Sequence, residues 1–306
     1  MRFAVLDVGS NTVNLLVVDA HRGSAPAPVH SERMDLRLAE HITREGRISK
    51  RAADALVRIV RTASARAKEL GSDEFLAMAT SAIREAANGR EVIAQVRAET
   101  GVRLTVLPGR DEAELTFLAV RRWYGWSSGR LLVADIGGGS VELAVGAGEQ
   151  PEQATSVPLG AGRMYREFFD EDPPRGSQVR ALRAHVRQTL LDHVADYTVA
   201  DINHAVGTSK TFRQLARLAA KTSGRGSEER VLQVDDLEDL CERLLKMDLP
   251  QRAALPRISE SRAPQLAAGS VVALELMRTL GIDSLEVCPW ALREGIILRR
   301  LDTLTG

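Results

Sequence analysis

The chain has 306 residues, of which 44% are hydrophobic and 27% are charged. This length suggests two domains, since domains average roughly 150 residues, and the composition excludes disordered and fibrous architectures. The 41 Lys and Arg residues balance 41 Asp and Glu residues, so there is no bulk positive field to hold nucleic acid or an anionic membrane. An anionic ligand therefore has to be bound by a local arrangement of side chains.

The cysteines and the N-terminus indicate the compartment. Cys241 and Cys288 are too few for a disulfide framework, and we expect free thiols in a reducing environment. Polar residues interrupt the apolar N-terminal stretch before a signal sequence or a membrane span of roughly 20 residues could form. We expect a soluble cytoplasmic protein that binds neither nucleic acid nor membrane. The six histidines are scattered and predict no zinc site.

The predicted elements begin with a β-hairpin over residues 2–17, in which a Gly-Ser-Asn turn interrupts Val- and Leu-rich runs. An amphipathic helix follows over Lys50–Leu70 and ends at Gly71. Further helical patterns cover residues 90–99, 111–124, 178–197, 210–221, 235–246, 264–280 and 291–302. Strand and helix segments that alternate after a hairpin predict an α/β architecture. Loops are predicted at the Asp-Pro-Pro stretch 172–174 and at the Gly- and Ser-rich stretch 221–230, which we expect to be mobile.

An internal repeat divides the chain. Residues 2–17 align without gaps on residues 130–145 at a shift of 128, with seven identities in sixteen positions. Two further pairs align, 77–81 on 205–209 at the same shift and 104–108 on 285–289 at a shift of 181. We predict an N-terminal unit over 1–124 and a C-terminal unit with a larger helical insertion over 125–306. Trp123, Tyr124 and Trp126 lie at the junction, where we expect them to pack a hinge.

The two hairpins carry the same chemistry at their turns. Asp7 and Asp135 each end a β run, and small residues follow whose backbone N–H groups can approach an anion. A carboxylate beside a phosphate is repelled unless a hard cation lies between them. We therefore predict that both acids bind Mg²⁺, directly or through water.

Two other segments keep more than one interpretation. Gly207–Thr211 lacks the glycine that a P-loop requires before its lysine, which leaves a helix N-terminus that could hold phosphate near Lys210. Glu112 opens a predicted helix, where an acid ordinarily complements the helix dipole, but it could also activate water beside a bound phosphate. No Gly-x-Ser-x-Gly segment occurs and no cysteine has a plausible histidine partner, so acyl chemistry has no support.

Five motifs in order resemble the exopolyphosphatase/guanosine pentaphosphate phosphohydrolase family over nearly the whole chain. They are Asp7–Thr12, Ala79–Asn88, Gly109–Ala113, Asp135–Glu142 and Ala291–Gly295. The resemblance implies two duplicated ribonuclease-H-like lobes of the sugar kinase, heat-shock chaperone and actin superfamily around a central cleft. Cys288-Pro289-Trp290 looks like the actinobacterial short form, whose length argues for shorter substrates.

The resemblance also implies a reaction, the hydrolysis of the terminal phosphoryl group of inorganic polyphosphate with Mg²⁺ or Mn²⁺. Glu112 would be the catalytic base, Asp135 and Glu142 would be catalytic acids at the metal, and Asp7 would be a further metal ligand. Phosphate would be bound by Ser10, Asn11, Thr12, Gly137, Gly138, Gly139, Ser140, Arg84, Lys210 and Arg293. Arg163 is a further candidate for gripping the following phosphates.

Three other functions stay open. A guanosine pentaphosphate 5′-phosphohydrolase of the stringent response would use the same acids, metal and loops. An ATP-dependent kinase would need an adenosine pocket, for which Ala267–Ser270 is a faint candidate. A non-catalytic polyphosphate or alarmone sensor would not need Glu112 as a base. The resemblance further implies a homodimer and guanosine penta- or tetraphosphate as substrates or inhibitors.

Overall fold

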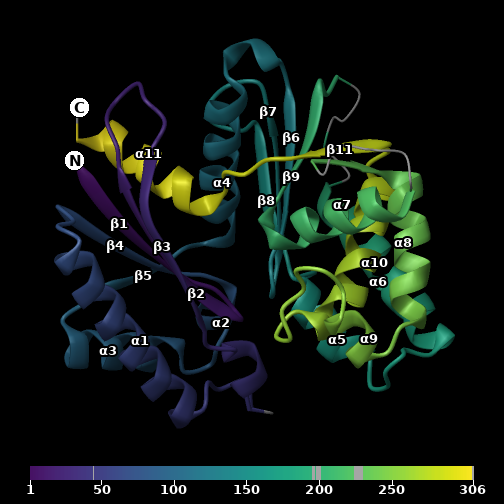
Figure 1. The fold of residues 1–306 in the computed structure, drawn as a ribbon, viewed down its shortest axis with the longest axis horizontal. Coiled ribbons are helices and arrows are strands. Elements are labelled where there is room, and N and C mark those ends of the chain that lie inside the picture. Colours follow the sequence, from purple (N-terminus) through teal and green to yellow (C-terminus); the bar gives the residue numbers. More distant parts are fainter. Residues whose placement is uncertain (44, 195–196, 198–200, 224–229, 305–306) are drawn as a thin grey trace. The chain divides into compact units, whose positions relative to one another are not determined.

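The computed structural model describes residues 1–43, 45–194, 197, 201–223 and 230–304 (Figure 1). The chain divides into two compact units. The first unit comprises Met1–Leu115 and Leu292–Gly306, and the second comprises Thr116–Ala291. The predicted loop 172–174 connects two helices of the second unit, whereas most of the loop predicted at 221–230 lies outside the described residues.

The first unit has a five-stranded sheet in the order β3-β2-β1-β4-β5. Its strands are β1 (Arg2–Val8), β2 (Thr12–Asp19), β3 (Ala27–Asp35), β4 (Glu74–Ala79) and β5 (Leu104–Val106). The first three strands are antiparallel, whereas β4 and β5 run parallel to β1. The helical segments are η1 (Leu38–His41), α1 (Lys50–Glu69), α2 (Ser81–Arg84), α3 (Gly89–Thr100), the first part of α4 (Gly109–Tyr124), and α11 (Leu292–Thr303).

Alternation along β1 decides which helices lie on each face of this sheet. Leu6 and Val8 belong to the apolar cluster that includes α1 and α3. Phe3 and Val5 belong to a second cluster on the other face, which includes α11. Asp7 follows Phe3 and Val5 at intervals of two residues, so its side chain lies on the same face of the sheet as theirs, the face that α11 covers.

The second unit has a six-stranded sheet in the order β10-β11-β9-β6-β7-β8. Its strands are β6 (Leu131–Ile136), β7 (Val141–Gly146), β8 (Gln153–Val157), β9 (His204–Thr208), β10 (Val231–Gln233) and β11 (Ser284–Val287). Its remaining helical segments are η2 (Trp126–Ser128), α5 (Ala161–Phe168), α6 (Gly176–Val194), α7 (Ser209–Ser223), α8 (Val234–Lys246), α9 (Leu249–Ala253) and α10 (Ala263–Thr279). The almost entirely buried α10 lies at the centre of the helical layer, in contact with α5, α6 and α8 (Figure 1).

The two sheets confirm the repeat found in the sequence. Strands β1, β2, β3, β4 and β5 correspond to β6, β7, β8, β9 and β11, in the same order and with the same directions. One register differs. Asp7 pairs with Met78, whereas Asp135 pairs with Thr208 and not with Val206, which a uniform shift of 128 would place there. The displacement of β9 by two residues keeps every side chain on its own face of the sheet. It places the Thr208 hydroxyl beside Asp135.

The unit boundaries differ from the predicted 1–124 and 125–306. The helix after β5, α4, contributes its later residues to the second unit, and the helix after β11, α11, belongs to the first. Packing explains this assignment. Phe117 and Val120 of α4 share an apolar cluster with β6, whereas Ile296 and Ile297 of α11 share one with β1. Apolar contact with a sheet therefore outweighs position in the chain.

The eight predicted helices are present as α1, α3, α4, α6, α7, α8, α10 and α11, with ends that differ by a few residues. The short helices α2, α5 and α9 were not predicted, because four to eight residues carry little helical periodicity. The junction aromatics lie in the second unit. The Trp123 ring packs edge-on against Trp290 at 5.3 Å, and Trp126 is 75% exposed.

Among the described helices, none combines the length and the apolar composition that crossing a membrane requires. Cys241 and Cys288 are buried free thiols, as predicted.

Candidate active site

Four polar side chains form a row across the sheet of the second unit. Asp135 on β6 pairs with Glu142 on β7, and Glu142 pairs with Ser156 on β8. On the other side, Asp135 pairs with Thr208 on β9. The Thr208 hydroxyl donates to Asp135 Oδ2, and Ser156 Oγ donates to Glu142 Oε1 at 2.8 Å. Two facing carboxylates are thus each held by a hydroxyl donor.

The two predicted acids of this unit therefore lie opposite each other on adjacent strands. Residues directly opposite in an antiparallel pair have Cβ atoms about 4.5–5.5 Å apart, a spacing at which like charges destabilise the sheet. Glu142 is only 3% exposed, so water screens this repulsion little. A bound cation would offset the repulsion, and Mg²⁺ commonly uses one or two carboxylates together with phosphate and water oxygens. The donor set fits Mg²⁺, although no cluster of three or more acidic, His or Cys ligands occurs among the described residues.

The corresponding row of the first unit has a different character. Asp7 pairs with Met78 on β4 and with Asn14 on β2, and Asn14 pairs with Arg33 on β3. This row holds one acid, an amide and a cation in place of two acids with two hydroxyls. Burial raises the pKa of the Asp7 carboxyl, while the Arg293 charge and a hydrogen bond from Asn14 act in the opposite direction. Arg293, a predicted phosphate ligand, therefore lies near Asp7 within the first unit.

The turns that follow the two acids have matching geometry. Gly9 N donates to Thr12 O at 3.0 Å, and Gly137 N donates to Ser140 O at 2.9 Å. In the first unit, Ser10, Asn11 and Thr12 fill the turn, and the buried Ser10 hydroxyl lies 2.9 Å from the hydroxyl of Ser81. In the second unit, Gly138 and Gly139 complete the turn. Asp7 and Asp135, with their turns, belong to different units.

Glu112 and Arg84, both predicted site residues, lie together in the first unit. Arg84 Nη1 donates to Glu112 Oε2 at 3.1 Å and to Leu107 O at 3.0 Å. The Glu112 and Arg84 side chains are 12% and 21% exposed, so the ion pair is partly shielded from solvent. Arg84 thereby joins α2 to the connection between β5 and α4 and orients the Glu112 carboxylate. This contact with Glu112 was not expected from the sequence, and the phosphate contact of Arg84 stays a prediction.

The residue directly after β9, Ser209, was noted in the sequence only as standing where a P-loop requires glycine. Ser209 begins α7 with a φ of 74°, in the left-handed region that non-glycine residues rarely occupy. Its hydroxyl is buried without a partner among the described residues. At a shift of 128, Ser209 corresponds to Ser81, but position 138 is glycine where Ser10 stands in the first unit. Lys210 follows in the first turn of α7 and is half-buried.

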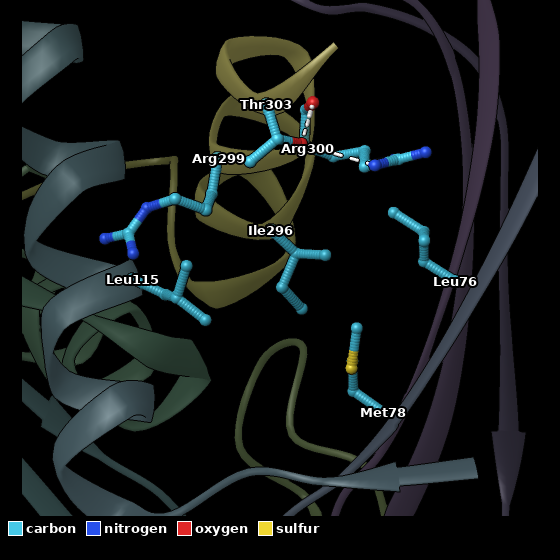
Figure 2. Close-up of a pocket in the computed structure, with 7 residues that line it drawn as sticks. All are labelled: Leu76, Met78, Leu115, Ile296, Arg299, Arg300 and Thr303. Atoms are coloured by element: carbon cyan, nitrogen blue, oxygen red, sulfur yellow. Dashed lines mark hydrogen bonds between the residues drawn. The ribbon is translucent and has the colours of Figure 1, made fainter. Parts of the chain in front are cut away.

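A pocket of about 220 Å³ in the first unit is chemically different from these sites. Figure 2 shows Ile296 between Leu115 and the β4 side chains Leu76 and Met78. Arg300, on its rim, is held by Glu74 through two hydrogen bonds of 2.7 and 2.9 Å. The lining contains no carboxylate, so this pocket does not have the donors of a metal–phosphate site.

The strand order, the duplicated units and an acid before a tight turn in each define a ribonuclease-H-like protein of the sugar kinase, heat-shock chaperone and actin class. The chain belongs to the Ppx/GppA phosphatase family, which it matches over residues 16–304. This confirms the resemblance found in the motifs.

Named relatives and a solved structure agree with this membership. The chain is 51% identical to Exopolyphosphatase 1 of Mycobacterium leprae, over 99% of this chain and 90% of that protein. It is 50% identical to Exopolyphosphatase 1 of Mycobacterium tuberculosis strain H37Rv, over 99% and 89%. The crystal structure of an exopolyphosphatase from Cytophaga hutchinsonii superposes with a TM-score of 0.89 at 24% identity, covering 99% of this chain and 98% of that one. At that identity, the structural likeness shows the fold.

Proposed function

We propose that this protein is an exopolyphosphatase, a hydrolase that removes the terminal phosphoryl group of inorganic polyphosphate and releases orthophosphate. The observation that carries the proposal is the pair Asp135 and Glu142 beside a Gly-rich turn, in a chain half identical to proteins named Exopolyphosphatase 1. Phosphoryl transfer depends chiefly on positioning and charge stabilisation. A carboxylate pair that suits a divalent cation and a turn of backbone donors supply both.

We assign roles from the family resemblance, and the contacts described above support some of them. Glu112, oriented by Arg84, accepts a proton from the attacking water. In the second unit, Asp135 and Glu142 would hold Mg²⁺ or Mn²⁺, and in the first unit Asp7 is the proposed metal ligand. The metal, when bound, neutralises charge on the phosphate oxygens. The proposed phosphate-binding residues are Ser10, Asn11, Thr12, Gly137, Gly138, Gly139, Ser140 and Arg84, with Lys210 and Arg293 for the following phosphates.

Further properties are part of the same proposal. Buried free thiols at Cys241 and Cys288 support a reducing, cytoplasmic location. Family membership supports guanosine penta- or tetraphosphate as secondary substrates or inhibitors, and a homodimeric state. Analytical ultracentrifugation measures the oligomeric state directly.

The test is phosphate release with Mg²⁺ from short polyphosphate, long polyphosphate, guanosine pentaphosphate and ATP. Glu112→Gln should abolish hydrolysis and leave polyphosphate affinity near that of the wild type, because it removes the base and keeps the phosphate ligands. Glu114→Gln is the matched control, since Glu114 is on the same helix and pairs with Arg110 at 2.9 Å. Hydrolysis of guanosine pentaphosphate in preference to every polyphosphate would replace the proposal. Binding without any hydrolysis by the wild type would identify a sensor.

A further inference from the structure

The Gly-rich turn of the second unit is hydrogen-bonded along one side to the start of α5. Ala161 N donates to Gly137 O at 3.0 Å, and Arg163 N donates to Gly138 O at 2.9 Å. The Arg163 side chain adds a third bond, in which Nε donates to Gly139 O at 2.9 Å. Three successive carbonyl groups of the turn therefore face α5. The two backbone bonds also satisfy helix N–H groups that have no partner within the first turn of a helix.

Because a peptide bond is planar, the direction of these carbonyl groups also fixes the direction of the N–H groups that follow them. In a planar trans peptide, the C=O of one residue points opposite to the N–H of the next. The carbonyls of Gly137, Gly138 and Gly139 face α5, so the N–H groups of Gly138, Gly139 and Ser140 point away from it. Successive N–H groups that converge on one side of a turn form an anion-binding concavity.

Close backbone packing keeps the turn against the helix. A Cβ atom at Gly160 would lie 2.3 Å from Gly139 C and 2.4 Å from Ser140 N. A Cβ atom at Gly162 would lie 3.0 Å from Gly138 O. The approach of α5 to the turn therefore depends on glycine at position 160, and the contact at position 162 is tight.

Arg163 contributes to this arrangement through its side chain as well as its backbone. Its Nε–H bonds the carbonyl of the last peptide in the turn, whose N–H belongs to Ser140. A charged donor strengthens such a bond and polarises the peptide, which makes the N–H at its other end a better donor. The guanidinium also lies 3.7 Å from Glu167.

We infer that Arg163 is a positioning residue that holds the Gly139–Ser140 peptide so that its N–H faces a bound phosphate. This assignment differs from the phosphate-gripping role that the sequence suggested for Arg163. It rests on the proposed phosphate-binding role of the turn, and it adds the device that keeps the donors aligned before substrate arrives.

The experiment compares Arg163→Met, Arg163→Lys and Glu167→Gln in the full chain. Arg163→Met keeps the aliphatic stem but removes the donor, and it should lower kcat/KM for polyphosphate about 10- to 100-fold, the usual cost of losing a residue that orients a ligand-binding group. Arg163→Lys keeps a cationic donor and should restore part of the loss. Glu167→Gln removes only the 3.7 Å ion pair and should stay within about twofold of wild type, as expected for an exposed pair.

Amide hydrogen exchange in the presence of orthophosphate distinguishes a residue that positions the turn for phosphate from one that only stabilises the fold. Orthophosphate should slow exchange of the Gly138, Gly139 and Ser140 amides in the wild type and in Glu167→Gln, but not in Arg163→Met. Wild-type kcat/KM together with wild-type protection in Arg163→Met would overturn the inference. If Arg163→Met does not fold, Arg163→Lys decides: partial activity with protection supports the inference, and loss of both overturns it.

Asp135→Asn separates this inference from the proposed function, because it leaves all three contacts between the turn and α5 in place. Full activity of Asp135→Asn would refute the proposed site itself. An inactive Asp135→Asn beside a fully active Arg163→Met would refute only the role of Arg163.

Discussion

Thr208→Val tests whether the polar row of the second unit is a metal site organised by its hydroxyls. Thr208 is fully buried and donates to Asp135 Oδ2. Valine has nearly the same shape, so the substitution removes the hydrogen bond without opening a cavity. The Asp135 carboxylate would then face Glu142 without the donor that now offsets part of their repulsion.

The loss of stability in Thr208→Val can be estimated from the type of hydrogen bond that it removes. A hydrogen bond to a charged group contributes about 1.5–3 kcal/mol, and full burial favours the upper part of this range. We expect Thr208→Val to lower the free energy of unfolding by about 2–3 kcal/mol in EDTA. Since the hydroxyl also orients a proposed metal ligand, the Mg²⁺ concentration for half-maximal activity should rise about 10- to 100-fold.

Thr211→Val is the matched control. Thr211 is also buried, at 5% exposure, but its hydroxyl donates to the neutral carbonyl of Ile136 at 2.9 Å. Its loss should cost about 1 kcal/mol and leave the Mg²⁺ requirement unchanged. The assays are urea unfolding in EDTA and phosphate release during Mg²⁺ titration. Equal losses of stability in the two variants, with no change in Mg²⁺ requirement, would refute the proposed organisation of the row.

Three further predictions concern other parts of the chain. Gly160→Ala should lower the free energy of unfolding by about 1–3 kcal/mol and remove most of the activity, because its Cβ overlaps the Gly-rich turn. Gly148→Ala, whose Cβ has no contact shorter than 3.6 Å, should change neither quantity. Urea unfolding and phosphate release measure the two effects. Ser209→Ala should raise KM for polyphosphate and leave the free energy of unfolding unchanged, since its hydroxyl has no partner among the described residues. Ser81→Ala should lower the free energy of unfolding by about 1 kcal/mol, because it loses a hydrogen bond. Equal losses of stability in the two variants would contradict this prediction. Asp19 accepts two hydrogen bonds from Arg2, which lower its pKa, so Asp19→Asn should slightly destabilise the protein at neutral pH and lose this effect as the pH falls through the acidic range. A pH-independent difference in unfolding free energy would refute that assignment.

Much of the fold could be predicted from the sequence because its signals are local. Alternating apolar residues, turn-forming residues and 3.6-residue periodicity depend on neighbours in the chain. The repeat adds a long-range constraint, since equivalent segments adopt equivalent strands. The pairs Asp7 with Asn14 and Asp135 with Glu142 follow directly, because a tight turn sets the register of each hairpin.

Family resemblance extended this prediction to the site, but mainly to residues within motifs. Glu112 and Arg84 belong to two separate motifs, and the structure brings them to 3.1 Å. The role of Arg163 could not be read from a motif, because it depends on how α5 packs behind the Gly-rich turn. Ser156, likewise, is identified only by its register opposite Glu142.

Local patterns and the internal repeat were therefore enough to predict the two related α/β units, the acids at the ends of their first strands and the phosphate-sized turns beside them. Two features became known from the three-dimensional structure: α11 belongs to the first unit, and Thr208, displaced by two residues, lies opposite Asp135. These features escape local patterns because parallel strand register and helix assignment depend on the packing of segments far apart in the chain. Local patterns specify which face a side chain occupies, whereas long-range contacts select its neighbour.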